Sequence, residues 1–383
     1  MSAVDVPATG GVSGSIITEL KNFPNNAPHD ISIGGERWLK TGLMETNPAK
    51  FDAYLWRWSV GTYWQPINVL GSVRVLDIAS NGAGIVIAIL PGGMYSRSAD
   101  GGKTFSGSTP LPNGGNEVMA IEWVSAFGLF IVVGRSGVIL TSTDGQAFQS
   151  RSSGTSASLQ TICWTGAVLV IGGDSKTIVT SINGINYTPK VVNITANYNA
   201  FYQIVHFDGK ILALAESHTN GSAISADNGA TWSMVTVDAS VSTAIHGGVH
   251  DGEKFVAVFS GSRVATSVNG TDWTVTAMTV SSVYSGSKLI FDAGQYWASS
   301  ASGGRIAKSE DLAIWRDFDI DFYTASPGTG SRVKKTGGQY WAMGTSAGLY
   351  RGNVEPYAGW PVAISAYGAE VTFNGQSAYA RVS

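Results

Sequence analysis

Ser225-Ala226-Asp227-Asn228-Gly229-Ala230-Thr231-Trp232 is the stretch of this 383-residue sequence that decides its fold, because copies of it recur along the chain. In each copy, which we call a box, a serine opens an Asp/Asn turn that ends on an aromatic residue. Successive box serines are separated by 44, 39, 44, 42 and 42 residues, and a degraded seventh copy surrounds Arg351. A period near 42 residues predicts a circular array of repeats. The six boxes are Ser98–Phe105, Ser142–Phe148, Ser181–Tyr187, Ser225–Trp232, Ser267–Trp273 and Ser309–Trp315.

The residues between the boxes share a strand pattern. A glycine-containing turn and then a short apolar run, such as Leu129–Val133, precede each box, which is typical of strands buried on both faces. Other strands come before this turn, lead into the box and leave it. Four antiparallel strands per repeat predict an all-β fold, a seven-bladed β-propeller over residues 54–353 whose closing strand comes from residues 54–69. Residues 1–53 are predicted to be an N-terminal arm and attachment segment, and residues 354–383 a short C-terminal β-hairpin.

Composition and charge exclude several classes of function. A net charge of −3 offers no basic surface to nucleic acid, and no apolar run approaches the roughly 18 residues of a membrane span. The single cysteine, Cys163, lies in an apolar run and is predicted to be a buried structural thiol. Met1–Pro7 lacks the basic start and apolar core of a secretion signal. We therefore expect synthesis in a host cytoplasm without a signal peptide, with no nucleic-acid partner and no membrane insertion.

The side chains of the boxes have structural roles in this interpretation. An Asp or Asn side chain accepts hydrogen bonds from the backbone of the turn that follows it, and the serine hydroxyl ties the turn together. The aromatic residue then fills space between strands. The residues predicted to do this are Ser98, Asp100, Phe105, Ser142, Asp144, Phe148, Ser181, Asn183, Tyr187, Ser225, Asp227, Trp232, Ser267, Asn269, Trp273, Ser309, Asp311 and Trp315.

The best-matched boxes, Ser98–Phe105 and Ser225–Trp232, resemble the Asp-box (BNR) repeat of sialidase-like propellers and of photosystem assembly factors. The resemblance covers about residues 70–353 and implies that the boxes lie on the face opposite an active site. Sialidase chemistry would need three arginines, a Tyr-Glu pair and an acid/base Asp, and the family's Arg-Ile-Pro motif near the N-terminus is missing. The nearest string, Arg305-Ile306-Ala307, lies late in the chain. We therefore expect no enzyme activity, no catalytic residues and no cofactor.

A second resemblance lies in residues 33–54. Glu36-Arg37-Trp38-Leu39-Lys40-Thr41-Gly42 and the following Glu45-Thr46 and Asp52-Ala53 are similar to a segment of bacteriophage tail-fibre and related tail proteins. This resemblance implies a virion tail protein of receptor-binding type. Its N-terminal arm would bind other tail proteins, the chain would form a homo-oligomer in the particle, and the propeller would bind a host-surface glycan or protein, or a neighbouring virion protein.

Candidate binding residues follow from geometry, because loops opposite the boxes are free to carry function. These loops combine Asn, Ser, Thr, Tyr and a few charges, and the candidates are Arg135, Asp174, Lys176, Tyr198, Glu216, His218 and Asn220. No metal site is predicted, because His246 and His250 lie in a strand and turn rather than on one helix face. The three carboxylates Asp317, Asp319 and Asp321 share one strand face, which suits a cation or sugar as well as simple solvation.

Two rival functions remain open at this point. A sialidase-like glycosidase would need an arginine cluster in a central pocket and would turn over sialosides. The second rival is an assembly-factor-like propeller that binds a protein partner. A strong positive patch on one face would support this function, and the net charge of −3 argues against such a patch.

Overall fold

The computed structural model describes most of the chain between residues 74 and 352 and several strands outside it. The described ranges are 29–33, 36–41, 52–58, 64–67, 74–192, 200–215, 221–237, 245–259, 263–278, 289–292, 294–299, 305–319, 332–343, 349–352, 362–365, 370–373 and 376–379. The chain divides into two compact units, one made of Met1–Trp64 with Gly352–Ser383 and the other of Gln65–Arg351. No helix in these ranges is long and apolar enough to span a membrane.

The described part of the larger unit, with β4 at its edge, forms seven four-stranded antiparallel sheets. Sheet 1 contains β5 (Asp77–Ser80), β6 (Val86–Leu90), β7 (Met94–Ser98) and β8 (Thr109–Pro110); sheet 2 contains β9 (Val118–Val124), β10 (Leu129–Gly134), β11 (Ile139–Ser142) and β12 (Gln149–Arg151). Sheet 3 contains β13 (Leu159–Trp164), β14 (Leu169–Gly173), β15 (Ile178–Ser181) and β16 (Thr188–Lys190); sheet 4 contains β17 (Phe201–Phe207), β18 (Lys210–Ala215), β19 (Ser222–Ser225) and β20 (Ser233–Val235).

The remaining three sheets repeat this order. Sheet 5 contains β21 (Ile245–His250), β22 (Phe255–Phe259), β23 (Arg263–Ser267) and β24 (Thr274–Ala277); sheet 6 contains β25 (Ile290–Asp292), β26 (Gln295–Ser299), β27 (Arg305–Ser309) and β28 (Arg316–Asp319). Sheet 7 contains β29 (Arg332–Thr336), β30 (Gln339–Met343), β31 (Leu349–Gly352) and β4 (Trp64–Ile67). A short 3₁₀ turn, η1 (Arg135–Gly137), joins β10 to β11.

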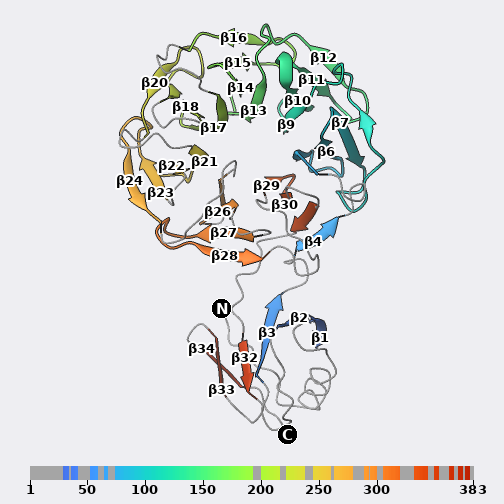
Figure 1. The fold of residues 1–383 in the computed structure, drawn as a ribbon, viewed down its shortest axis with the longest axis vertical. Helices are drawn as coiled ribbons and strands as arrows, with labels where there is room; N and C mark the ends of the chain where they lie inside the picture. Colours follow the sequence, from blue (N-terminus) through green and yellow to red (C-terminus); the bar gives the residue numbers. More distant parts are fainter. Residues whose placement is uncertain are drawn as a thin grey trace. The chain divides into compact units, whose positions relative to one another are not determined.

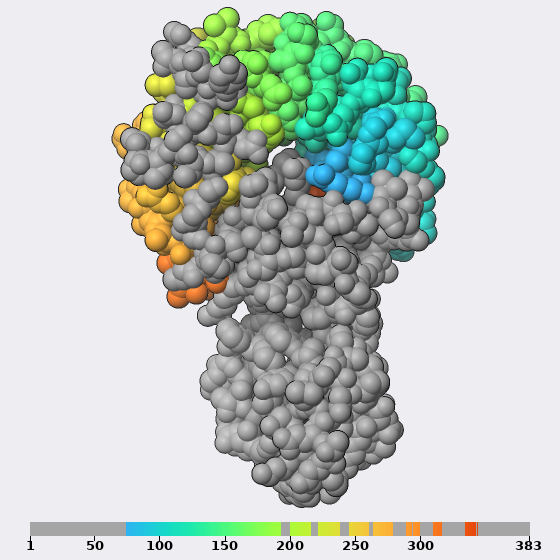
Figure 2. All heavy atoms as spheres, in the orientation of Figure 1, coloured from blue at the N-terminus to red at the C-terminus, as the bar shows by residue number. Residues whose placement is uncertain are grey.

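Within the larger unit, the sheets follow one another around a ring, with the first strand of each sheet toward the centre and the fourth at the rim (Figure 1). Figure 2 shows the described atoms of sheets 1 to 5 in the same succession, from blue to orange. Because the strands are antiparallel, two kinds of turn lie at each end of a sheet. We call the end with the boxes and the first-to-second-strand turns the box end. The loop end carries the second-to-third-strand turns and the connections between sheets.

The apolar core lies between neighbouring sheets. In β6, Val86, Ala88 and Leu90 pack toward sheet 7, whereas the alternate residues Ile87 and Ile89 pack toward sheet 2. All five are essentially inaccessible to solvent. Successive side chains of a strand point to opposite faces, so a strand buried on both faces must be apolar throughout. This confirms the prediction that the apolar runs are buried on both faces.

The smaller unit draws on both ends of the sequence. Its sheet has the order β1-β2-β3-β32, formed by β1 (His29–Ile33), β2 (Glu36–Thr41), β3 (Asp52–Trp58) and β32 (Val362–Ser365). β33 (Glu370–Phe373) and β34 (Gln376–Tyr379) form a separate antiparallel pair. Of the segment 54–69 that was predicted to close the propeller, β4 lies at the edge of sheet 7, whereas residues 54–58 belong to β3 of this unit.

The all-β class predicted from the sequence is confirmed by these antiparallel four-stranded sheets. One detail differs. Cys163, predicted to be buried, is half-buried at the edge of the cluster that contains Val170 and Phe201. It occupies one of the half-buried positions of the inner strand β13, whereas the second strand β14 is buried throughout.

Candidate functional site

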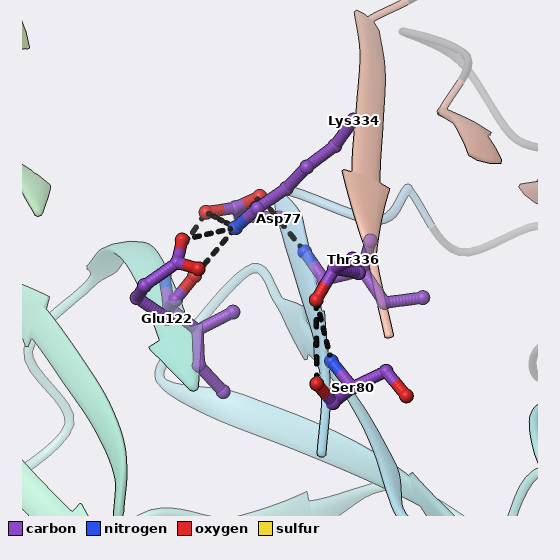
Figure 3. Close-up of polar contacts among 7 residues, drawn as sticks. Asp77, Ser80, Glu122, Lys334 and Thr336 are labelled. Atoms are coloured by element: carbon purple, nitrogen blue, oxygen red, sulfur yellow. Dashed lines mark hydrogen bonds and ion pairs between the residues drawn. The ribbon is translucent and has the colours of Figure 1, made fainter. Parts of the chain in front are cut away.

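A buried lysine meets two carboxylates on the inner strands of three sheets (Figure 3). Lys334 of β29 places Nζ 3.2 Å from each carboxylate oxygen of Asp77 in β5 and 3.1 Å from Oε2 of Glu122 in β9. The same ammonium donates to the carbonyl oxygen of Ile121 at 2.6 Å. This cluster, which we call the Lys334 clamp, therefore joins sheet 7 to sheets 1 and 2.

The backbone of the inner strands holds the clamp in place. Lys334 and Glu122 occupy equivalent positions, each in the third residue pair counted from the first-to-second-strand turn of its sheet. Asp77 accepts the N–H of Ile78 on Oδ1 at 2.9 Å and the N–H of Ile121 on Oδ2 at 3.0 Å. Backbone hydrogen bonds from two strands thus hold this carboxylate in place in addition to the lysine.

The clamp is an ionic cross-link rather than a reactive centre. Burial would lower the pKa of Lys334, but the carboxylates of Asp77 and Glu122 more than offset this effect, and the pKa is raised. The amine is therefore protonated at neutral pH, and all three of its N–H groups have acceptors. A lysine nucleophile needs the opposite, a lowered pKa and a free lone pair. Thr336 adds a second joint between sheets 7 and 1, because its Oγ1 accepts the N–H of Ser80 at 3.0 Å.

Sequence reasoning missed the Lys334 clamp. The available signal was a single charged residue in each of two inner-strand segments that are otherwise apolar, Asp77 in residues 75–79 and Glu122 in residues 118–124, whereas Lys334 lies among other charged residues in 332–336. An isolated buried charge needs a partner. The partners are 257 residues apart for Lys334 and Asp77, so only closure of the ring brings them together.

The box turns form a hydrogen-bonded unit that the fourth box illustrates. Ser225 Oγ donates to Asp227 Oδ1 at 2.7 Å and accepts the N–H of Gly229 at 2.8 Å. Asp227 in turn accepts the backbone N–H of Thr231 at 2.9 Å. Trp232 closes the turn by donating its indole N–H to the carbonyl oxygen of Gly229 at 3.2 Å. Every polar group named has a partner within the turn.

The other five boxes repeat this arrangement. The serine hydroxyl lies within hydrogen-bond distance of the acid or amide oxygen in the pairs Ser98–Asp100 (2.7 Å), Ser142–Asp144 (3.1 Å), Ser181–Asn183 (3.4 Å), Ser267–Asn269 (3.0 Å) and Ser309–Asp311 (3.2 Å). All six serines are buried. Of the box aromatics, Trp232 and Trp315 are buried and Phe105, Phe148, Tyr187 and Trp273 are half-buried.

These hydrogen bonds keep the box carboxylates ionised. The Thr231 hydroxyl and N–H, together with the Ser225 hydroxyl, lower the pKa of Asp227 to about 2. In the sixth box, the N–H groups of Ile314 and Ala313 lower the pKa of Asp311. A carboxylate that accepts several N–H and O–H donors is stabilised in its charged form.

The box ends also join each sheet to the one before it. Gly102 has φ +82° and lies against the indole of Trp341 in sheet 7, so closely that a Cβ would overlap the ring. Arg97 of sheet 1 donates from Nε to the carbonyl oxygen of Asp144 in the second box at 2.9 Å. The rings of Tyr95 and Phe148 meet edge-on at 5.1 Å. The boxes therefore act as joints between sheets.

The loop end is built differently. In sheet 2, Arg135 donates its backbone N–H to the carbonyl oxygen of Glu117 at 2.9 Å and its Nε to the Glu117 carboxylate at 2.9 Å. In sheet 3, Asp174 donates its backbone N–H to Ser158 at 2.8 Å and accepts a hydrogen bond from Gln160 at 2.9 Å. Each turn is thus bonded to the strand that enters its own sheet.

Non-glycine residues at this end take left-handed backbone conformations. Ser136 has φ 56°, Ser175 has φ 55° and Lys176 has φ 62°. Such conformations are unfavourable for residues with a Cβ, and Asp208, Asn228 and Leu312 adopt them at the box end as well. The structure places three predicted binding residues, Arg135, Asp174 and Lys176, in these two turns. Four others, Tyr198, Glu216, His218 and Asn220, lie outside the described residues.

The histidines that were considered as metal ligands have other contacts. His250 accepts the N–H of Gly252 on Nδ1 at 3.0 Å and stacks on Phe207 with ring centroids 3.6 Å apart. Burial lowers the pKa of His250 and of His246. No group of three or more His, Cys, Asp or Glu side chains with metal-site geometry occurs among the described residues.

Comparison with known proteins identifies the fold. No protein-family model matches the sequence, and no curated protein matches it. Solved structures do match. YCF48 bound to D1 peptide has a TM-score of 0.60 at 14% identity, over 76% of this chain and 95% of that one. A catalytically inactive virginiamycin B lyase from Staphylococcus aureus with quinupristin has a TM-score of 0.63 at 13% identity, over 76% and 99% of the two chains.

A third similar structure, the WD40 β-propeller domain of Doa1, has a TM-score of 0.55 at 12% identity, over 75% of this chain and 95% of that domain. The chain is therefore a β-propeller protein. Because these propellers include an enzyme and non-enzymes, the likeness carries information on the fold alone.

Proposed function

We propose that this chain is a non-enzymatic virion tail protein of receptor-binding type, built on a seven-bladed Asp-box propeller. The seven four-stranded sheets are its blades, and β4 is the strand that completes the last of them. The propeller binds a host-surface glycan or protein, or a neighbouring tail protein, through its loop end. The segment before residue 54 binds the particle, in which the chain is a homo-oligomer.

The observation that carries this proposal is the contrast between the polar groups of the two ends of the sheets. At the box end, the box serines and acids bond within their own turns. In the middle of the inner strands, the buried Lys334 is paired with its carboxylates. At the loop end, Arg135 is exposed, and Arg135, Asp174 and Lys176 are held on turns whose backbone is fixed. Fixed turns that carry varied polar side chains suit recognition of sugars or protein surfaces.

Two of the similar propellers were solved with bound ligands, a D1 peptide in YCF48 and quinupristin in the lyase variant. A propeller of this size can therefore serve as a binding scaffold. The tail location is supported by residues 33–54, which resemble a segment of phage tail-fibre proteins.

Two experiments test the proposal. Electron microscopy of purified particles with an antibody to the propeller should place the protein on the tail. Adsorption of particles to host cells should be reduced at least tenfold by Arg135→Ala combined with Lys176→Ala. The matched control is Lys103→Ala, which removes an exposed cation at the box end. Absence of the protein from particles overturns the location, and equal adsorption of variant and control overturns the role of the loop end.

A further inference from the structure

The boxes of sheets 3, 5 and 6 expose large aliphatic side chains. Ile182 and Ile185 of the third box are 77% and 49% exposed, Val268 of the fifth is 77% exposed and Ile314 of the sixth is 52% exposed. Among the described residues, large exposed hydrophobic side chains are otherwise limited to Val191, Phe207 and Met234. Single exposed apolar residues are ordinary, but four in the same kind of turn on one end of a molecule form a pattern.

The charges around these side chains are predominantly acidic, with Lys210 and Lys254 as the basic residues in the first-to-second-strand turns of sheets 4 and 5. The boxes of sheets 3 to 6 contain no Lys or Arg, and their acidic residues are Asp227, Asp272, Glu310 and Asp311, all of them exposed. In contrast, the first box contains Lys103, and Arg97 reaches the second box. Because Asp100 and Asp144 of the first two boxes have these cations beside them, the excess of acidic over basic residues in the boxes falls, like the exposed aliphatic side chains, in sheets 3 to 6.

The position of the aliphatic residues within the box explains why they are free to vary. Ile182 and Val268 directly follow the box serine, where other boxes have Ala99, Thr143 or Ala226. The hydrogen bonds of the turn use the serine, the acid and later backbone groups, so the side chain at this position contributes nothing to the turn. The fold therefore does not require an aliphatic side chain at this position.

We propose that the box end of sheets 3 to 6 is a docking surface for a basic, aliphatic segment of a partner protein. Lys and Arg of the partner would face the ionised carboxylates, and its aliphatic side chains would cover Ile182, Val268 and Ile314. Complementary charge steers such encounters, and burial of apolar surface stabilises them. This surface lies at the opposite end of the sheets from the loops proposed to bind the host ligand, and it is independent of that proposal.

The test uses the full chain and a fluorescein-labelled peptide of alternating Lys and Leu residues. We expect saturable binding by fluorescence anisotropy, weakened at least tenfold by Val268→Ser with Ile314→Ser and also by Asp272→Lys with Glu310→Lys. Val191→Ser is the matched control, because Val191 is 89% exposed but lies beyond the outer strand of sheet 3 rather than in a box. Higher salt should weaken binding, since the attraction is partly ionic.

Three outcomes would overturn the proposal. The first is no saturable binding of the Lys/Leu peptide. The second is equal binding of a Glu/Leu peptide, or equal loss in the Val191→Ser control. The third is self-association of the chain in analytical ultracentrifugation that Val268→Ser with Ile314→Ser abolishes, because the occupant would then be a second copy of this chain. Circular dichroism of each variant establishes that it is folded.

Discussion

The box end and the loop end of the same sheets are held together in different ways. At the box end, polar contacts cross from one sheet to the next: Arg97 of sheet 1 donates to the carbonyl oxygen of Asp144 in the second box, and Lys335 pairs with Asp292 at 2.6 Å. At the loop end, the contacts described for Arg135 and Asp174 remain within one sheet and the strand that enters it. Polar contacts between neighbouring sheets therefore occur in the box turns and, through the Lys334 clamp, in the middle of the inner strands.

This difference matters for stability and for the recognition that we propose for the loop end. Residues that join sheets cannot change without loss of a buried contact, whereas a turn bonded only to its own sheet can change its side chains. A propeller can thus keep one end constant for folding and vary the other for binding. Substitutions at matched positions of the two ends test this division directly.

The largest expected effect is that of Lys334→Met. The substitution leaves the carboxylate of Asp77, which is almost fully buried, without its ammonium partner. Removal of one member of a buried ion pair costs about 3–5 kcal/mol. We expect a correspondingly lower urea midpoint, followed by tryptophan fluorescence. Lys103→Met, at an exposed position, should remain within about 0.5 kcal/mol of the parent. A Lys334→Met midpoint equal to that control would show that the clamp does not stabilise the ring.

A smaller effect is expected from a matched pair of glycines. Gly102 at the box end and Gly92 at the loop end have φ +82° and +74°, so alanine at either costs about 1–2 kcal/mol. Only at Gly102 would the new Cβ overlap Trp341, which adds about 1–3 kcal/mol of overpacking. The difference in melting temperature between Gly102→Ala and Gly92→Ala measures the contribution of the contact between Gly102 and Trp341. Equal loss in both variants would contradict a special role of the box end.

The smallest expected effect is on the stability of the chain at acidic pH. The pKa of Asp227 is about 2 in the folded chain and about 3.9 when unfolded. A lowered folded pKa contributes stability that is present above pH 4 and is lost as the pH falls toward 2. We expect the urea midpoint of Asp227→Asn to lie below that of the parent at pH 6 and to approach it near pH 2. A constant difference between the two proteins across this range would rule out the hydrogen-bonded carboxylate as its source.

Local repetition made the sheets predictable from sequence. Each box with its preceding apolar run is contained within about 42 residues, and the same physical requirements recur in every copy. The Lys334 clamp was not predictable in this way, because it is not repeated and it joins residues far apart in the chain. The pairing of β3 with β32 is a similar case, since Asp52 lies opposite Ser365 in that register.

The candidate binding residues were only partly accessible to sequence reasoning. Counting turns from the boxes assigned Arg135, Asp174 and Lys176 to one end of the sheets, and the register agrees with that assignment. The left-handed conformations of Ser136 and Ser175 had no sequence signal, since serine rarely adopts them. The aliphatic and acidic arc of the boxes was visible in the sequence, but its exposure depends on the packing of neighbouring sheets.

The Lys334 clamp also has a consequence for biosynthesis. Asp77 and Lys334 are separated by 257 residues. At about 5–20 residues per second, Asp77 is synthesised about 13–50 s before its partner. During that interval, the first sheet has neither its ionic partner nor a seventh sheet to cover Val86 and Leu90. The nascent chain therefore exposes the apolar face of sheet 1 until β29 and β30 have been synthesised. Exposed apolar surface of this kind is what chaperones bind during synthesis.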